Sequence, residues 1–442
     1  MTQSDFIAVI DLGTSKIKGV VGRKSEYNVI SILESETIDS GNSVRRGMVY
    51  NIEEAGANIR KLLTMLENKI DDKIGKVYVS LTGQSLHTIE HIERKNLSSN
   101  GIVTQEIVDQ LNDSAGKYIP DLQRNYAVAD VEYYVDGKTE KNPVGVAGTE
   151  IEAHFQIIVG RPNLITNIER SVTGKAKIPI AGYLIGSLAS AAISLSEEDK
   201  ELGCAFIDFG AGTTSMSIYK NGILRRSVVI PFGGKNITKD ISALNLIESE
   251  AEQLKIKLGK AIKTQESSFF SSPFSSKAEV NDTELIRVIG LRLDEITANI
   301  KEQIRLSGYE NQLGAGVIIT GGASQLKNIS EYLVQKLNMP VRKVTAKKIF
   351  INNASELTNN PSSTLALGML LLGKESCRLV EEKDIFENKD DFSSTEKNRT
   401  ESKRTDRKQN SKDSNRNIKT PKQGIFTKVS DALGNLFSED DE

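Results

Sequence analysis

The first 81 residues alternate between short apolar segments and one amphipathic segment. Residues 6–22 carry β-branched side chains on both sides of a Gly/Thr/Ser turn, which is typical of two strands joined by a hairpin. In residues 52–66 the apolar positions recur every three or four residues, and this period predicts a helix. Residues 77–81, Val-Tyr-Val-Ser-Leu, predict a further strand.

Residues 82–160 break this pattern and predict a small inserted subdomain. They contain one helix-like stretch, residues 105–118, and several short strands, the last at residues 155–159. A helix over residues 164–171 and a strand over residues 202–207 are expected to follow.

The opening pattern then returns in residues 205–219. A strand again ends at an aspartate, Asp208, and a Gly/Thr-rich turn again leads into a second strand. Asp208 lies 197 positions after Asp11 (208 minus 11), so a whole motif is repeated and a duplicated architecture is predicted. Two helices, near residues 247–258 and 284–306, are expected after the second copy.

The last 68 residues, counted from 375, divide into a polar and an apolar part. Residues 375–423 have few apolar side chains and predict a disordered linker. In residues 424–438 the apolar side chains return on one face of a helix about 20 Å long, so this helix is expected to lie on a membrane rather than cross it. The alternative is a helix that packs on the chain's own core or on a partner. The residues assigned to the membrane are Ile425, Phe426, Val429, Leu433, Leu436 and Phe437.

Charge supports the membrane interpretation only in part. Residues 398–423 have nine Lys/Arg and three Asp/Glu, a net charge of +6 that suits an anionic surface. The four acidic residues 439–442 oppose it, so a single helix of this kind should bind weakly and reversibly. Many copies on one filament would bind firmly because their effective concentration is high.

The composition agrees with a globular chain of two or more domains. Of its 442 residues, 38% are hydrophobic and 26% charged, and the net charge of −2 at pH 7 gives no indication of a nucleic-acid partner. The two cysteines, Cys204 and Cys377, lie far apart, which favours a reducing compartment. A strand starts close to Met1, so we expect no signal peptide, and no apolar run is long enough to span a membrane.

Each of the two repeated hairpins has the residue types of a phosphate-binding loop. A turn rich in Gly, Thr and Ser lets backbone N–H groups approach phosphate oxygens without obstruction by Cβ atoms. A carboxylate beside such a turn suits Mg²⁺ held through water, which assigns the metal to Asp11 and Asp208. Either hairpin alone is explained as well by a tight glycine turn, but two copies can hold one nucleotide from both sides. The residues assigned to ATP in the hairpins are Asp11, Gly13, Thr14, Ser15, Lys16, Asp208, Gly210, Gly212, Thr213 and Thr214.

Further glycine-rich turns could contact the adenosine. The strand over residues 317–320 runs into a glycine turn, where a backbone can lie flat against adenine or ribose. A Gly-Gly pair follows the apolar residues 228–230, and an acidic and a basic residue lie three apart on one helix face. Each of these features alone is also explained as an ordinary turn or surface pair. The residues added to the ATP site are Gly233, Gly234, Glu252, Lys255, Gly321, Gly322 and Ala323.

The order and spacing of these loops resemble the actin/DnaK/sugar-kinase superfamily. Within it, several stretches are similar to the FtsA family of bacterial division proteins, from Ile7 to about Gly373 and again at the last helix. These stretches are Arg-Arg-Gly-Met-Val at 45–49, Val-Tyr-Val-Ser-Leu-Thr-Gly at 77–83, the segment 136–145 that begins Asp-Gly and ends Asn-Pro-Val-Gly, and Glu-Gln-Leu-Lys at 252–255.

The resemblance implies an α/β protein with a duplicated actin-like (ribonuclease H-like) fold. Two domains would surround a nucleotide cleft, with an inserted α+β subdomain, a disordered linker and a terminal amphipathic helix. The expected boundaries are 1–81, 161–196 and 363–374 for subdomain 1A, 82–160 for the inserted subdomain 1C, 197–227 and 308–362 for subdomain 2A, 228–307 for subdomain 2B, 375–423 for the linker and 424–438 for the membrane helix.

The resemblance also implies a function. The chain would bind ATP and Mg²⁺, polymerise, tether FtsZ filaments to the cytoplasmic face of the cell membrane at the septum, and recruit later division proteins through the inserted subdomain. Its partners would be the C-terminal peptide of FtsZ, further copies of itself and an anionic membrane surface. Arg292 and Glu295, about one turn apart on a helix, would face the FtsZ peptide, although ordinary surface charge explains them too.

Two positions depart from the family's pattern. Ser215 stands where relatives carry an aspartate after the second hairpin, and Gly186 stands where relatives often carry a glutamate. Hydrolysis needs a group that orients or deprotonates water, and these are the usual candidates. We therefore expect at most a weak ATPase in which the nucleotide acts as a structural element and a switch.

Two other interpretations stay open at this point. A sugar-kinase-type phosphotransferase would need a catalytic aspartate in the cleft and a sugar pocket, and the sequence indicates neither. An actin-like pilus-assembly protein would share the subdomain plan, but the long linker and the terminal amphipathic helix count against it. A metal site at His87 and His91 is not expected, because residues 86–93 alternate as in a strand and no third ligand is evident.

Overall fold

The computed structural model describes residues 5–97, 101–263, 281–353 and 356–379. Most of the predicted linker and all six predicted membrane residues, Ile425, Phe426, Val429, Leu433, Leu436 and Phe437, lie outside the described residues. None of the helices in the described ranges is long and apolar enough to cross a membrane.

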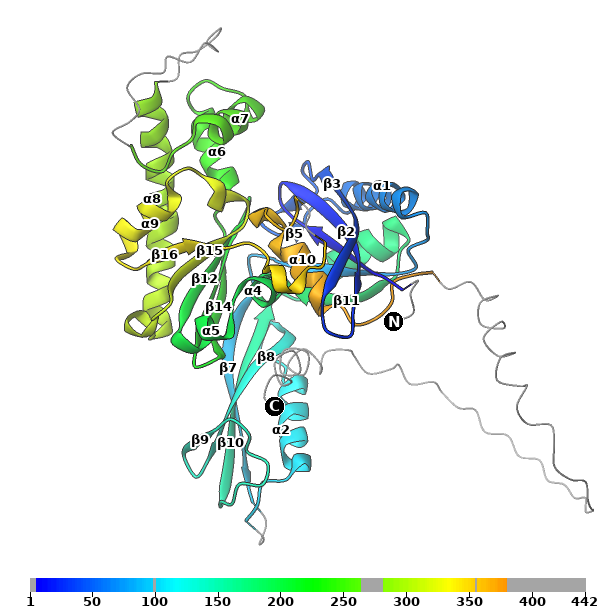
Figure 1. Cartoon of the computed structure of the whole chain (residues 1–442), viewed down its shortest axis with the longest axis vertical. Helices are drawn as coiled ribbons and strands as arrows, with labels where there is room; N and C mark the ends of the chain where they lie inside the picture. Colours follow the sequence, from blue (N-terminus) through cyan, green and yellow to red (C-terminus); the bar gives the residue numbers. More distant parts are fainter. Residues whose placement is uncertain (1–4, 98–100, 264–280, 354–355, 380–442) are drawn as a thin grey trace, which may run out of the picture. The chain divides into compact units, whose positions relative to one another are not determined.

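The first lobe is built on a five-stranded sheet in the order β11-β6-β1-β2-β3 (Figure 1). β1 and β2 form the antiparallel hairpin that the sequence predicts, and β6 runs parallel to β1 on its other side. Helix α1 (Ile52–Ile70) starts where the Asn51 side chain accepts a hydrogen bond from the Glu54 N–H, and it buries the apolar face expected from its period. The strands are β1 (Ile7–Leu12), β2 (Lys16–Lys24), β3 (Ile30–Asp39), β6 (Val77–Leu81) and β11 (Ile180–Ile185), with a short pair β4 (Val44–Arg45) and β5 (Met48–Val49).

The second lobe repeats this plan. β12 pairs antiparallel with β13 on one side and parallel with β15 on the other, as β1 does with β2 and β6. The predicted duplication is therefore present in the strand topology. The strands are β12 (Cys204–Phe209), β13 (Thr214–Lys220), β14 (Ile223–Ile230), β15 (Gly316–Thr320) and β16 (Val341–Lys343). The helices are α6 (Gly234–Ser242), α7 (Glu248–Leu258), α8 (Asp282–Ser307) and α9 (Ile329–Leu337).

One predicted element boundary is wrong. The sequence predicted a strand from residue 202, but Leu202 ends a short helix, α5 (Glu197–Leu202), and the strand starts at Cys204. Ser196 and Asp199 form a capping box that starts this helix, and Gly203 with φ +92 separates it from the strand.

The inserted subdomain has its own core but joins the second lobe. Its elements are β7 (His87–Asn96), α2 (Gln105–Lys117), β8 (Arg124–Val135), β9 (Lys138–Glu140) and β10 (Glu150–Gly160). Helix α2 packs on the sheet through a separate hydrophobic cluster that includes Phe155 and Leu111. The chain enters and leaves this subdomain from β6 and α3 (Asn163–Glu169) of the first lobe, yet β7 pairs with β14, so one nine-stranded sheet runs through both (Figure 1).

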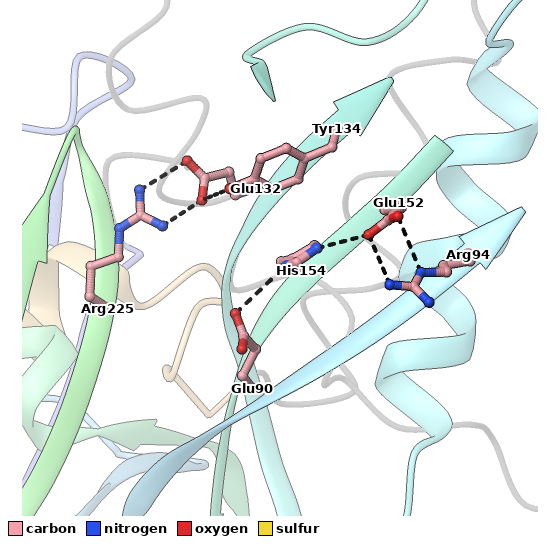
Figure 2. Close-up of polar contacts among 7 residues, drawn as sticks. All are labelled: Glu90, Arg94, Glu132, Tyr134, Glu152, His154 and Arg225. Carbon is pink, nitrogen blue, oxygen red and sulfur yellow. Dashed lines mark hydrogen bonds and ion pairs between the residues drawn. The ribbon is translucent and has the colours of Figure 1, made fainter. Parts of the chain in front are cut away.

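Polar contacts strengthen this junction. Arg225 of β14 donates two hydrogen bonds, of 2.5 and 2.9 Å, to Glu132 of β8, and each side chain is only 11% exposed. The Leu224 N–H donates to Asp130 Oδ2 over 2.9 Å. Figure 2 shows the Arg225–Glu132 pair beside Tyr134, which donates to the same carboxylate.

Two apolar helices, α4 (Gly186–Ser194) and α10 (Thr364–Leu372), pack against each other. A Cβ atom on Gly368 would lie 1.9 Å from the Ala189 carbonyl oxygen, so only glycine allows this approach. α4 contacts β11 of the first sheet and also β12 and β13 of the second. It is therefore an element of the first lobe that also packs on the second.

The segment after α10 remains part of the fold for longer than expected. The linker was predicted from residue 375, but Cys377 is fully buried and its N–H donates to the Phe6 carbonyl oxygen over 2.7 Å. Arg378 donates to Asp72 over 2.9 Å. A single buried cysteine in a polar segment changes the composition too little to predict that residues 375–378 belong to the fold.

Candidate functional site

The two predicted phosphate hairpins have the same local geometry. A Cβ atom on Gly13 would lie 2.6 Å from the Lys16 carbonyl oxygen, and one on Gly210 would lie 2.8 Å from the Thr213 carbonyl oxygen. Both turns therefore fold back so tightly that only glycine fits at their first position. The Gly210 N–H donates to the Thr213 carbonyl oxygen over 2.9 Å and closes the second turn.

The hairpins meet each other across the two lobes. A Cβ atom on Gly212 would lie 2.4 Å from Thr14 Oγ1, so the two turns are in van der Waals contact there. Thr14 Oγ1 also accepts a hydrogen bond of 3.1 Å from the Gly47 N–H. Ser15 and Lys16 are exposed at the tip of the first turn. The structure thus brings the two predicted phosphate hairpins together.

The two predicted metal-site aspartates are half-buried beside the turns, and each accepts a hydrogen bond from a serine hydroxyl. Ser80 Oγ donates to Asp11 Oδ1 over 3.0 Å, and Ser190 Oγ donates to Asp208 Oδ2 over 2.8 Å. Burial raises the pKa of Asp11, and the Ser80 hydrogen bond opposes this shift. Burial, together with the nearby charge of Asp11, raises the pKa of Asp208 to about 6, although the Ser190 hydrogen bond opposes the shift.

A lysine that the sequence reasoning missed lies next to Asp11. Lys18 is buried, pairs with Asp11 across the hairpin, and donates from Nζ to the Ser362 carbonyl oxygen and to Ser363 Oγ over 3.0 and 2.9 Å. Burial lowers the pKa of Lys18, and the charge of Asp11 opposes this. The prediction chose Lys16, which is exposed. The hairpin register, which places residue 18 opposite residue 11, is the signal that would have found it.

The predicted Gly-Gly pair is bound directly to the second hairpin. The Gly234 N–H donates to the Gly210 carbonyl oxygen over 3.0 Å, and the Lys235 N–H donates to the Ala211 carbonyl oxygen over 2.7 Å. A Cβ atom on Gly233 would lie 2.6 Å from the carbonyl oxygens of both residues. Glycine at 233 is therefore required for the close approach of this loop to the hairpin.

Lys255 and Glu252, which were predicted to share one face of a helix, lie on α7 beside this loop. Lys255 Nζ donates to the Gly234 carbonyl oxygen over 3.0 Å, to Thr238 Oγ1 over 2.8 Å and to Glu252 Oε2 over 2.7 Å. Thr238 also donates to Glu252. The lysine is thus held in place by three acceptors at the edge of the site.

The last predicted loop closes the site on the other side. Gly321 has φ +89, and a Cβ atom there would lie 2.3 Å from Asp208 Oδ1. A Cβ atom on Gly234 would lie 3.2 Å from that of Ala323, so the two loops that were predicted to contact the adenosine touch each other. Gly322 is exposed. The predicted ATP residues therefore form one connected group.

This group suits a triphosphate with a hydrated Mg²⁺. Two half-buried carboxylates, a buried lysine, and threonine and serine hydroxyls on glycine turns are the groups that bind such a ligand. The described residues include no cluster of three or more His, Cys, Asp or Glu that could hold a metal ion by themselves. Asp11 and Asp208 would accordingly hold Mg²⁺ through water.

The two positions that depart from the family's pattern have different surroundings. Ser215 lies opposite Asp208 in the second hairpin, as Lys18 lies opposite Asp11 in the first. A Cβ atom on Gly186 would lie 2.5 Å from Thr82 Cγ2, so a glutamate would need its neighbours to move.

The two predicted partner residues line one cleft between α6 and α8. Its volume is about 360 Å³, and it is lined by Asp240, Ala243, Val288, Leu291, Arg292 and Glu295. Arg292 donates two hydrogen bonds, of 2.6 and 2.9 Å, to Asp240, and it also contacts Glu295. Arg292 therefore joins the two helices, which a spacing argument alone did not predict.

Comparison with solved structures supports the fold. The chain is similar to the structure described as a PilM-PilN type IV pilus biogenesis complex, with a TM-score of 0.59, 16% identity, and coverage of 84% of this chain and 98% of that one. At this identity the likeness shows the actin-like fold alone.

Comparison with known sequences gives the family. The profile described as Cell division protein FtsA matches residues 205–368, and the profile of the SHS2 domain inserted in FtsA matches residues 83–159. The chain is 28% identical over 383 residues to the cell division protein FtsA of Pseudomonas aeruginosa, covering 83% of this chain and 89% of the relative. It is 36% identical over 370 residues to that of Porphyromonas gingivalis, covering 81% of this chain and 77% of the relative. The chain therefore belongs to the FtsA family of cell division proteins.

Proposed function

We propose that this division protein binds Mg²⁺ and ATP, forms filaments, and links FtsZ to the cytoplasmic face of the cell membrane at the septum. The observation that supports nucleotide binding is the pair of hairpins, which meet at Thr14 and Gly212 beside two half-buried aspartates. Family membership favours this function over the pilus-assembly and sugar-kinase alternatives.

Nucleotide binding is tested at an exposed residue of the first turn. Ser15→Glu places a carboxylate where the phosphates would lie, and charge repulsion should weaken ATP binding at least about tenfold. The matched control is Thr64→Glu on the exposed face of α1, which should leave binding unchanged. Calorimetry with ATP and Mg²⁺ decides the matter. If both variants bind ATP with the affinity of the wild type, the hairpins do not form the ATP site.

ATP would act mainly as a strut between the lobes and as a switch for polymerisation. Ser215 and Gly186 are not acids or bases that could activate water, and a longer side chain at 186 would meet Thr82. Bound Mg²⁺ would neutralise charge on the phosphates. We expect turnover well below about 1 per second. A rate at or above this value in purified filaments would contradict the proposal.

The cleft between α6 and α8 is the proposed docking place for the FtsZ C-terminal peptide. Leu291 is 58% exposed and lines the cleft, so it can contact a peptide without a role in the fold. Arg292 is a poorer probe because it holds Asp240. Leu291→Glu should weaken peptide binding about tenfold or more, as expected for a buried apolar contact. Leu306→Glu, on the same helix and 49% exposed but outside the cleft, is the control. Equal binding by both variants would move the FtsZ site elsewhere.

Membrane attachment is proposed for residues 424–438, from the sequence alone. Filaments should co-sediment with vesicles that contain anionic lipid, and less with neutral vesicles. Removal of residues 424–442 should abolish co-sedimentation while ATP binding remains. If the shortened chain still binds vesicles, the terminal helix is not the anchor.

Recruitment of later division proteins is proposed for the inserted subdomain, whose separate core lets it present a surface of its own.

A further inference from the structure

Helix α4 is bound to the second lobe by two serines one turn apart. Ser190 Oγ donates to Asp208 Oδ2 over 2.8 Å, and Ser187 Oγ lies 3.2 Å from Ser227 Oγ of β14. α4 directly follows β11 of the first sheet, so both hydrogen bonds cross from the first lobe to the second. Ser190 is fully buried.

The two aspartates of the site are held in different ways, although their hairpins are copies of each other. Asp11 accepts a hydrogen bond from the hydroxyl of Ser80, which lies on the neighbouring strand of the same sheet. The corresponding neighbour of Asp208 is Thr320, which pairs with it across β12 and β15. Thr320 Oγ1 is instead bonded to the Pro361 carbonyl oxygen over 3.3 Å. Asp208 instead accepts a hydrogen bond from Ser190 of α4, across the lobe boundary.

This arrangement fixes the direction of the Asp208 carboxylate. Oδ2 is held by Ser190, and Oδ1 lies against Gly321, where a Cβ atom would be 2.3 Å away. A carboxylate fixed at one oxygen presents the other in a single direction, which pre-organises it for a ligand. Without Ser190 the side chain could rotate about its terminal torsion, which is a broad one in aspartate.

We propose that Ser190 is a positioning residue that holds Asp208 for the hydrated Mg²⁺ of the nucleotide and thereby links metal binding to the contact of α4 with the second lobe. This inference rests on the proposed binding of ATP and Mg²⁺. Ser190 does not touch the ligand itself. Its role is exerted through Asp208, and the expected consequence is a change in the Mg²⁺ requirement rather than in the affinity for free ATP.

The chain provides a matched control on the same helix. Ser194 is also buried on α4, and its hydroxyl has no hydrogen-bond partner among the described residues. Ser190→Ala and Ser194→Ala therefore each remove a buried hydroxyl from the same helix. The hydroxyl of Ser190 donates a hydrogen bond to a carboxylate, whereas that of Ser194 does not. Ser190→Cys fills the same space with a weak donor and replaces Ser190→Ala if that variant does not fold.

The experiment measures ATP binding by the full chain in a Mg²⁺ titration and again with EDTA. Ser190→Ala should raise the half-saturating Mg²⁺ concentration about tenfold, as expected for loss of a hydrogen bond to a charged group, and change metal-free binding less than about twofold. Ser194→Ala should match the wild type in both measurements.

The outcomes separate this inference from the proposed function. If Ser190→Ala and Ser194→Ala show the same Mg²⁺ dependence, Ser190 does not position Asp208. If Ser190→Ala weakens free ATP and Mg²⁺-ATP equally, its role is structural and the inference is also overturned. If the wild type binds no ATP, the nucleotide function itself fails, whatever the serine variants do.

Discussion

Asp130 of the inserted subdomain should limit the stability of the fold at neutral pH. It lies on β8, and it accepts the Leu224 N–H of β14 at Oδ2 over 2.9 Å and the Val131 N–H at Oδ1 over 3.0 Å. Burial raises its pKa from 3.8 to about 6, although both N–H groups and the charges of Lys200 and Arg225 lower it. The charged carboxylate is thus unfavourable at the junction with the second lobe.

The sign of the pH dependence follows from this raised pKa. The folded chain holds the proton more tightly than the unfolded chain, so the contribution to stability is complete below about pH 4 and is lost as pH rises through about 6. A shift of about two units corresponds to about 3 kcal/mol, an upper bound because water reaches part of the side chain. Asp130→Asn keeps the Leu224 bond but loses the one from Val131, which costs about 1 kcal/mol.

The substitution should therefore stabilise the chain by about 2 kcal/mol at pH 7.5 and destabilise it by up to about 1 kcal/mol at pH 4. Urea denaturation at both pH values measures the two free energies of unfolding. Asp136→Asn is the control of opposite sign, because hydrogen bonds from Thr149 and Glu150 hold the pKa of Asp136 below its ordinary value. If Asp130→Asn were destabilising at pH 7.5, or had the same effect at both pH values, the reasoning from burial would be refuted.

Three further substitutions test other contacts. Glu132→Gln leaves the Arg225 guanidinium buried without its carboxylate, and should lower the free energy of unfolding by about 3 kcal/mol in urea denaturation. Gly368→Ala puts a Cβ atom 1.9 Å from a carbonyl oxygen of α4, and should lower the melting temperature strongly or prevent folding, as followed by circular dichroism. Gly212→Ala should force the second hairpin away from Thr14 and weaken ATP binding in calorimetry while the helix content stays the same.

The hairpins could be predicted because their determinants are local. Asp11 and Asp208 are each the last residue but one of a strand, and the glycines two positions later fit only a tight turn, so a few neighbouring residues define each loop. Repetition of the motif then indicated that the two hairpins, although far apart in the sequence, belong to one nucleotide site. The amphipathic period of α1 was likewise readable from its own residues, which bury the expected face.

The groups that hold the aspartates could not be predicted in this way. Ser80, Ser190 and Lys18 are ordinary residues in their own segments, and they gain a role only through strand pairing or through the packing of α4 on the second lobe. Ser190 lies 18 positions before Asp208 (208 minus 190), in a different element of a different lobe. A single sequence carries no signal for such a contact unless the fold is already known.

The inserted subdomain shows most clearly what connectivity conceals. The chain joins it to the first lobe at β6 and α3, whereas hydrogen bonds join its sheet to the second lobe at β14. The direct strand pairing is short, with Val228 opposite His87, and the side chains of Asp130 and Glu132 add hydrogen bonds from Leu224 and Arg225 to it. Any change in the angle between the lobes must therefore be absorbed either in the two covalent connections or at this junction. Because separation of Arg225 from Glu132 would leave a buried charge without its partner, the junction resists such a movement, and rotation within the two covalent connections would accommodate it.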